Sequence, residues 1–283
     1  MPVSLPPALV LSPDLLRCPV CRTRRLHPGH GALRCPVGHT FDLARHGCAS
    51  LLAGARATSG DDAAMVQARD RFLSTGAYAP IRKVGARLAA DTASEQTTVV
   101  DVGCGTGYYL VGVLDQLPDA RGLGLGTSVR ALCSAARAHD RAAVAAWDVF
   151  RPFPLTDGAV DVVLNVFAPR NPAEFPRVLR PTGRLIVVRP TMWHLAELRR
   201  QVSAMVTADP AKEQHLHRAP NPFFAAVVTE QVEYSVPLTR LDALDLVAMT
   251  PSARRVNRAD LNDDGLLPDQ VTVSVPATAY QPR

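Results

Sequence analysis

The stretch TTVVDVGCGTGYYLVGVLDQL, residues 97–117, constrains the fold of this chain more than any other part. A β-branched run closes on Asp101, an apolar helical pattern ends the stretch, and between them lie Gly103, Gly105 and Gly107. A strand, a glycine loop and a helix in this order form the first unit of a doubly wound nucleotide-binding sheet, because glycine lets backbone N–H groups approach a ligand. The stretch therefore predicts an α/β fold with a ligand crevice at the loop.

The rest of the chain alternates strand and helix patterns in the same way. Upstream, residues 61–89 predict a helix that breaks at Gly76 and a second helix that begins near Pro80. Downstream we expect a short strand in 120–129, a helix in 128–140, a third strand in 142–150, a nearly continuous apolar strand in 159–169, and a helix end, a Pro-Thr-Gly turn and a fifth strand in 177–190.

The stretch CPVCRTRRLHPGHGALRCPVGH, residues 18–39, carries the spacing of a tetrahedral zinc site. A C-x2-C pair and a C-x3-H pair supply four ligands: Cys18, Cys21, Cys35 and His39. A closed set of four ligands leaves no position for water, so the metal should stabilise the fold without doing chemistry. His27 and His30 compete for the fourth position, and unrelated buried thiols with a surface histidine are the alternative to a metal site.

Composition bears on compartment and partner. No apolar run approaches the about 18 residues that cross a bilayer, and the N-terminus has no basic region before its apolar residues, so we expect a cytoplasmic protein without a membrane partner. The chain has a formal net charge of +5, and nearly all of its positively charged residues are arginines. The planar guanidinium group of arginine suits phosphate, so nucleic acid is a candidate partner. A GC-rich coding sequence is the alternative source of this arginine.

The motif DVGCGTG resembles the first motif of class I S-adenosylmethionine-dependent methyltransferases more than the dinucleotide fingerprint. That resemblance implies that the glycines admit the amino-acid end of the cofactor and that Asp101 orients its ammonium. It also places Asp148 where such enzymes hold the adenine amino group, a solvated carboxylate being the alternative. The acid that usually binds the ribose hydroxyls at the end of the second strand is absent: Gly126 stands there, with Thr127, Ser128 or water as substitutes.

Over residues 15 to about 200 the chain resembles the bacterial 23S ribosomal RNA guanine-N1 methyltransferases, which include resistance enzymes of producers of tylosin- and mycinamicin-type macrolides. The resemblance rests on LRCPVCR, LRCPVGHTFDLARHGCASLL, MVQARDRFLSTGAYAPI, DVGCGTGYYL, LNVFAPRNPAEFPRVLRPTGRL and HLAEL. It fades toward the C-terminus, where Arg254 stands at a position expected to be tryptophan.

The resemblance implies a class I methyltransferase (Rossmann-like) doubly wound α/β sheet with a small N-terminal zinc-binding module. We expect the module in residues 1–52, a helical linker region in 53–95 and the methyltransferase-like domain in 96–283. Zinc is expected at the four ligands above and an RNA hairpin as substrate. The expected S-adenosylmethionine site comprises Asp101, Gly103, Gly105, Gly107, Tyr108, Thr127, Asp148 and Asn165.

Methyl transfer to guanine N1 is an in-line displacement that depends on positioning, and a flipped base is read between aromatic faces. The catalytic candidates are Phe167, Arg170, Asn171 and His194, with Tyr109 and Trp193 as further candidates and a packing role as the alternative for each. No residue is identified as acceptor of the N1 proton. The competing hypothesis is that the chain is a diverged relative that acts on or binds a small molecule. For the oligomeric state, a homodimer is one of the arrangements left open by the sequence.

Overall fold

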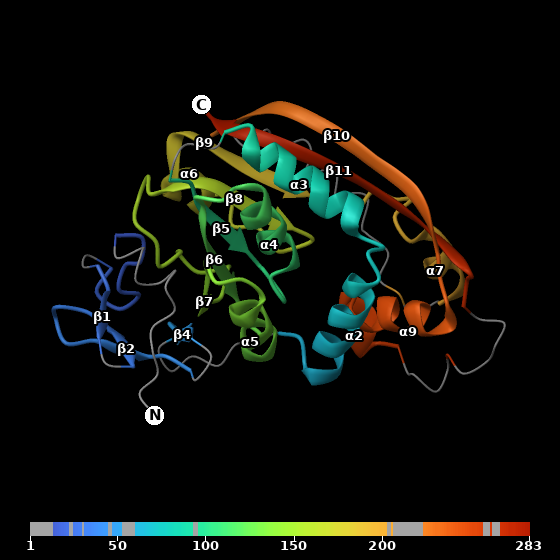
Figure 1. The fold of residues 1–283 in the computed structure, drawn as a ribbon, viewed down its shortest axis with the longest axis horizontal. Coiled ribbons are helices and arrows are strands. Elements are labelled where there is room, and N and C mark those ends of the chain that lie inside the picture. Colours follow the sequence, from blue (N-terminus) through green and yellow to red (C-terminus); the bar gives the residue numbers. More distant parts are fainter. Residues whose placement is uncertain are drawn as a thin grey trace.

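An eight-stranded mixed sheet forms the centre of the computed structural model (Figure 1). The structure describes residues 14–22, 25–29, 31–44, 47–52, 60–92, 96–202, 205, 223–256, 261 and 267–283. In spatial order the strands are β10 (Phe224–Pro237), β11 (Gln270–Pro282), β9 (Leu179–Val188), β8 (Val160–Val166), β5 (Thr98–Val102), β6 (Arg121–Gly126), β7 (Ala142–Ala146) and β4 (Cys48–Ser50).

The order of the five central strands confirms the predicted doubly wound sheet. From β7 through β6, β5 and β8 to β9 all neighbours are parallel, with the first strand of the series in the middle. Only β11 runs against its neighbours, β9 and β10. The carboxyl ends of β5 and β6 therefore meet at one edge of the sheet, beside the glycine loop, where open α/β sheets bind ligands.

The helices follow the predicted pattern. Asp62 caps α2 by accepting a hydrogen bond from the backbone N–H of Met65, Gly76 ends the segment with a φ of +81°, and Pro80 lies in the first turn of α3. In Figure 1, α3 lies along the long antiparallel strands β10 and β11, whereas α2 packs against α9. Within the described residues the helices are α2 (Ala63–Ser74), α3 (Ala79–Ala90), α4 (Tyr108–Gln116), α5 (Val129–Ala138), α6 (Glu174–Val178), α7 (Ala196–Gln201), α9 (Arg240–Ala248) and the 3₁₀ helix η1 (Pro251–Arg254).

The expected Pro-Thr-Gly turn before the fifth strand lies inside β9. The pairing of β8 with β9 jumps from Leu179 to Arg184 while β8 advances by two residues, so residues 180–183 bulge out of the ladder. Gly183 permits the close return, since a Cβ there would lie 2.9 Å from the carbonyl oxygen of Asp161. The sequence thus correctly predicts that the chain bends at Pro-Thr-Gly, but the bend forms a bulge within β9 and does not separate a helix from the strand.

The N-terminal region packs directly on the large sheet. Its antiparallel strands β1 (His27–Gly29), β2 (Ala32–Arg34) and β3 (Thr40–Asp42) form a separate small sheet, whereas β4 pairs in parallel with β7. Leu16, Phe41 and Leu51 are buried in the same cluster as Val100 and Val163 of the central strands. The domain boundary at residue 52 stays a prediction, and contacts cross it.

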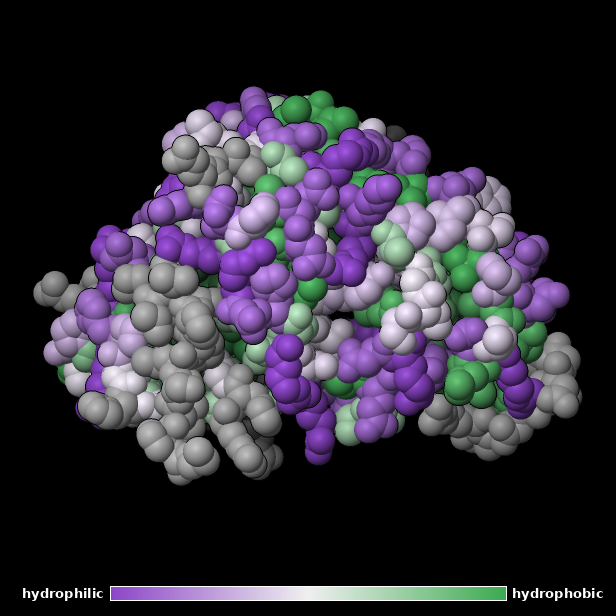
Figure 2. Space-filling view, viewed as in Figure 1, coloured by the Kyte–Doolittle hydropathy of each residue, from purple (hydrophilic) through white to green (hydrophobic). Residues whose placement is uncertain are grey.

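The surface shows no broad apolar area on the face drawn in Figure 2, where hydrophilic residues dominate and hydrophobic ones form small separate patches. In the described ranges no helix is both long enough and apolar enough to cross a membrane.

Candidate metal centre and cofactor crevice

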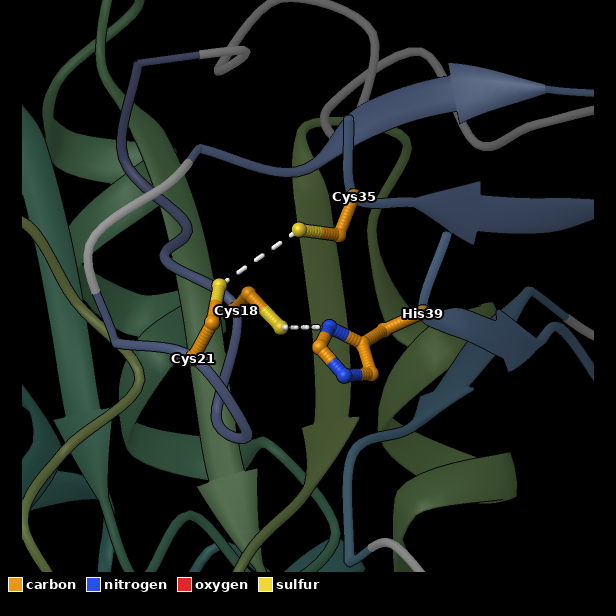
Figure 3. Close-up of side chains that lie close together, drawn as sticks. All are labelled: Cys18, Cys21, Cys35 and His39. Carbon is orange, nitrogen blue, oxygen red and sulfur yellow. Dashed lines mark hydrogen bonds between the residues drawn. The ribbon is translucent and has the colours of Figure 1, made fainter. Parts of the chain in front are cut away.

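The four predicted metal ligands converge on one point (Figure 3). Cys18 and Cys21 come from the first turn of the module, Cys35 follows β2 and His39 precedes β3. Their ligand atoms all lie within 4.8 Å of one another. Gly38, with a φ of +103°, lets the second turn close just before His39.

The donor set fits a zinc ion. Cys18 Sγ lies 3.5 Å from His39 Nδ1, and Cys21 Sγ lies 3.5 Å from Cys35 Sγ. These separations approach the edge lengths of a tetrahedron with metal–sulfur bonds of about 2.3 Å, and they are too long for a disulfide. His27 is exposed on β1 and outside this cluster, and His30 lies outside the described residues.

The glycine loop after β5 requires glycine at each predicted position. Gly103, Gly105 and Gly107 have φ values of +87°, +53° and +85°, a region that side chains rarely adopt. A Cβ on Gly103 would lie 2.4 Å from the Cβ of Ala168, and one on Gly107 would lie 3.0 Å from the Cβ of Ala135. The loop therefore depends on glycine for its conformation and its close packing, and it leads directly into the N-terminus of α4, the end of a helix that favours negative charge.

Asp101 is the group in this crevice that most needs a cationic partner. Its side chain is 2% exposed, its Oδ2 is buried without a hydrogen-bond partner among the described residues, and burial raises its pKa to about 7. An ammonium group at this carboxylate would satisfy the orphaned oxygen and favour the charged form. The amino-acid end of S-adenosylmethionine carries such a group, so the site fits the predicted cofactor.

The other predicted cofactor residues lie at the ends of neighbouring strands. Asn165 on β8 is fully buried, and its amide donates to the carbonyl oxygens of Val102 and Pro169, which holds the strand end in place. Asp148 follows β7 and accepts a hydrogen bond from the backbone N–H of Phe150 at 3.0 Å. Beside it, the buried Trp147 leaves its Nε1 without a partner among the described residues.

Tyr108 and Thr127 lie at two turns of the crevice. Tyr108 is the first residue of α4, and the guanidinium of Arg82 lies 5.1 Å from its ring centre. Thr127 follows β6 and comes directly before Ser128, whose side chain caps α5. Gly126 has room for a side chain, because a Cβ there would lie 3.6 Å from Leu132 Cδ2.

Two of the four catalytic candidates, Phe167 and His194, form an aromatic stack. Phe167 directly follows β8, has a left-handed φ of +50° and is 39% exposed. Its ring stacks on His194 at 5.4 Å with an interplanar angle of 25°, and Tyr78 lies 6.0 Å from both rings. A non-glycine residue in this conformation is strained, and such strain gathers at functional sites.

The hydrogen bonds of His194 fix its tautomer. The backbone N–H of Ser274 donates to Nδ1 at 3.3 Å, so the proton resides on Nε2, which lies 3.3 Å from the Tyr78 hydroxyl. Burial lowers the pKa of His194 to about 4. The ring is therefore neutral near pH 7, and its one lone pair is already used.

The remaining candidates hold backbone or lie at the surface. Arg170 donates from Nε to Asn165 Oδ1 at 3.2 Å, and the Asn171 amide donates to the carbonyl oxygens of Val149 and Arg151. These bonds tie the loops after β7 and β8 together. Trp193 is 57% exposed, and Tyr109 lies 6.3 Å from the Phe167 ring.

An ion pair that the sequence patterns do not predict lies over the glycine loop. Arg69 Nη1 lies 2.7 Å from Asp61 Oδ2, and 2.9 Å from the point that a Cβ on Gly105 would occupy. Arg69 also donates to the carbonyl oxygen of Met249 beyond α9. The spacing of eight residues, about two helical turns, is the one signal in the sequence, although it gives no hint of Gly105.

Comparisons with known proteins agree with this architecture. The zinc-ribbon family model described as "RlmA, N-terminal" matches residues 16–56. A 23S rRNA (guanine(748)-N(1))-methyltransferase from Streptomyces fradiae is 42% identical, covering 94% of this chain and 96% of the relative. A relative from Micromonospora griseorubida, provisionally named a 23S rRNA (guanine-N(1)-)-methyltransferase, is 41% identical, covering 96% of this chain and all of the relative.

The fold also matches a solved structure. A protein from Anabaena variabilis, provisionally described as a methyltransferase from an antibiotic biosynthesis pathway, matches with a TM-score of 0.50 at 15% identity. The match covers 71% of this chain and 96% of that one. At this identity the likeness concerns the fold alone.

Proposed function

Since this chain belongs to the family of 23S rRNA (guanine-N1)-methyltransferases, we propose that it transfers a methyl group from S-adenosylmethionine to N1 of a guanine in a 23S rRNA hairpin. The observation that carries the proposal is the 42% identity to the guanine-748 enzyme over nearly its whole length. Cofactor binding has independent support, because the carboxylate of Asp101 lies without a hydrogen-bond partner for Oδ2 among the described residues, beside a loop with three left-handed glycines.

Residues at the carboxyl ends of β5, β7 and β8 would hold the cofactor. Asp101 accepts hydrogen bonds from the ammonium, the loop of Gly103 to Gly107 admits the amino-acid end, and Asp148 accepts from the adenine amino group. Asn165 keeps the end of β8 at a fixed distance from β5 through its bond to Val102. When bound, the cofactor supplies a sulfonium-activated methyl group.

The exposed face of Phe167 would receive the target guanine. Stacking on an aromatic ring orients a flipped base while leaving its edge free, and His194 supports Phe167 from behind. Positioning of this kind is the main demand of an in-line displacement. His194 serves as a positioning residue and does not take the N1 proton, because its lone pair accepts from Ser274.

The zinc module would hold the RNA. Its described arginines are Arg17, Arg22, Arg25 and Arg34, of which Arg17 pairs with Asp157 at 3.1 Å and Arg25 pairs with Asp14; Arg24 lies outside the described residues. Arg22 and Arg34 are exposed and form no salt bridge among the described residues, so they fit phosphate contacts. Macrolide resistance and a homodimer stay predictions from the sequence.

The small-molecule alternative is favoured by two departures from the family pattern, the absence of an acid at Gly126 and Arg254 at a position expected to be tryptophan. It predicts a protein that binds S-adenosylmethionine but leaves ribosomal RNA unmodified. The same assay therefore separates the two functions.

Methyl transfer from labelled S-adenosylmethionine to a 23S rRNA hairpin transcript tests the proposal, with the modified base located by the primer-extension stop that N1-methylguanine causes. Phe167→Ala should lower kcat/KM about 10- to 100-fold, since base stacking contributes about 1–3 kcal/mol, and leave S-adenosylhomocysteine affinity unchanged. Gly105→Val should lose the cofactor and serves as the inactive control. Cofactor binding without transfer to the hairpin would favour the small-molecule alternative.

A further inference from the structure

The crevice lacks a hydrogen-bond acceptor that its fold usually provides at the end of β6. In doubly wound folds an acidic residue about 20 positions after the glycine loop binds the ribose hydroxyls. Gly126 stands at that point, and a Cβ there would make only ordinary van der Waals contact with Leu132. Unless a neighbouring segment supplies a carboxylate, the ribose hydroxyls of the cofactor would be left to water.

The segment before α2 lies against this end of β6. The Ser128 hydroxyl donates to the carbonyl oxygen of Asp61 at 2.7 Å, and a Cβ on Gly60 would lie 3.2 Å from Ser128 Cα and 3.3 Å from Thr127 Oγ1. On the other side, Arg254 donates to the carbonyl oxygen of Gly60 at 2.5 Å. Residues 60 and 61 are therefore held beside Thr127 from two directions.

The Asp61 carboxylate lies between the ends of β5 and β6. Its Oδ2 is buried and lies 2.7 Å from Arg69 Nη1, the atom that lies over Gly105. The side chain nevertheless keeps 18% of its surface exposed, and that exposure belongs to atoms other than Oδ2. Oδ2 is thus paired by charge with Arg69 but has no hydrogen-bond partner among the described residues, so the carboxylate keeps unused acceptor capacity beside the two strand ends.

We propose that Asp61 replaces the acid missing at Gly126 and accepts hydrogen bonds from the ribose hydroxyls of the cofactor. The proposal rests on the proposed function, because it takes the nucleoside to lie in this crevice. Arg69 is a positioning residue that holds the carboxylate in place. The alternative is an ion pair that only anchors α2 to the glycine loop.

Calorimetric titration with two ligands separates these roles: S-adenosylhomocysteine and its analogue that lacks both ribose hydroxyls. Asp61→Asn should weaken S-adenosylhomocysteine binding about 10- to 100-fold, the range for a hydrogen bond to a charged group. It should leave affinity for the dideoxy analogue unchanged, because that ligand has no hydroxyl to donate. A purely structural ion pair would instead weaken both ligands by the same factor.

A matched control and a rescue variant sharpen the test. Asp62→Asn makes the same chemical change one residue along, and asparagine keeps the cap of α2, so both affinities should stay at the wild-type value. Gly126→Asp in the Asp61→Asn background returns a carboxylate to the end of β6, where a Cβ makes only ordinary contact with Leu132. This double variant should recover S-adenosylhomocysteine affinity by about 10-fold or more.

The outcomes are distinct. Equal losses for both ligands in Asp61→Asn, or no loss for either, would overturn the role of Asp61 while leaving the methyltransferase proposal intact. Binding of neither ligand by the wild-type chain would overturn the proposed function and this inference together. Selective loss of the hydroxyl-bearing ligand with rescue by Gly126→Asp supports the assignment.

Discussion

Replacing Asp101 by asparagine should change the stability of the ligand-free protein in a pH-dependent way. The carboxylate is buried behind the glycine loop, with one oxygen unpartnered among the described residues. An asparagine side chain at this position would be neutral at every pH and would remove the buried charge. We therefore expect Asp101→Asn to stabilise the ligand-free chain at pH 8 relative to the wild type, while removing the negative charge that would pair with the cofactor ammonium.

The magnitude follows from the two pKa values of this group. Burial raises the pKa of Asp101 from 3.8 to about 7, which corresponds to about 4 kcal/mol at roughly 1.4 kcal/mol per pKa unit. Because the folded-state pKa is the higher one, the contribution to stability is fully present below pH 3.8 and is lost as the pH rises toward 7. About 3 kcal/mol of that loss falls between pH 5 and pH 8.

Urea unfolding of both proteins at pH 5 and pH 8 measures this effect. At each pH we compare the unfolding free energy of the variant with that of the wild type. From pH 5 to pH 8 this difference should shift by about 3 kcal/mol in favour of the variant, because all other groups titrate alike in both proteins. Asp119→Asn, which removes an exposed carboxyl group, is the control. S-adenosylhomocysteine should stabilise the wild type at pH 8 more than it stabilises the variant, because the variant lacks the charge that pairs with the ammonium. A pH-independent difference between the two proteins would refute the reasoning.

Two further predictions concern the N-terminal module. Wild-type protein purified without added zinc should contain about one zinc per chain by metal analysis. The variants Cys18→Ser and Cys35→Ser should lose this zinc, and their N-terminal module should become sensitive to proteolysis. A zinc content near zero in the wild type would refute the site. Replacing Arg22 and Arg34 together by alanine should flatten the salt dependence of hairpin binding by about two in log–log slope, one for each phosphate that is no longer neutralised. Filter binding over a salt series measures this, and equal slopes would remove the module from the RNA interface.

The sequence predicted well those features that depend on local residue patterns, namely the zinc ligands, the glycine loop and the central strands. The zinc ligands lie within 22 residues, and their geometry depends on short turns around Pro19, Pro36 and Gly38. The glycine loop and the order of the central strands follow from strand, loop and helix patterns along the chain. In each case the deciding contacts join residues close in sequence, or obey a topological rule that allows few alternatives.

Contacts between distant segments could not be predicted in the same way. The stack of Phe167 on His194 depends on a left-handed residue after β8, and nothing in the residues around Phe167 indicates that conformation. Asp61 and Arg69 lie in a segment whose pattern indicates only a capped helix, yet α2 carries Arg69 to the glycine loop, which lies far along the chain. Tertiary packing determines such sites, because each uses side-chain length and direction that periodicity does not encode.

The position of β4 explains why the module and the crevice should behave as one unit. β4 pairs with β7, and the backbone N–H of Leu51 donates to the carbonyl oxygen of Ala146, the residue before Trp147 and Asp148. Leu51 itself is fully buried in the core of the sheet. The chain that leaves the zinc turns is thus joined to the strand that ends at the proposed adenine contact. An RNA held by the module would therefore lie at a fixed distance from the cofactor crevice, as positioning of a guanine for in-line transfer requires.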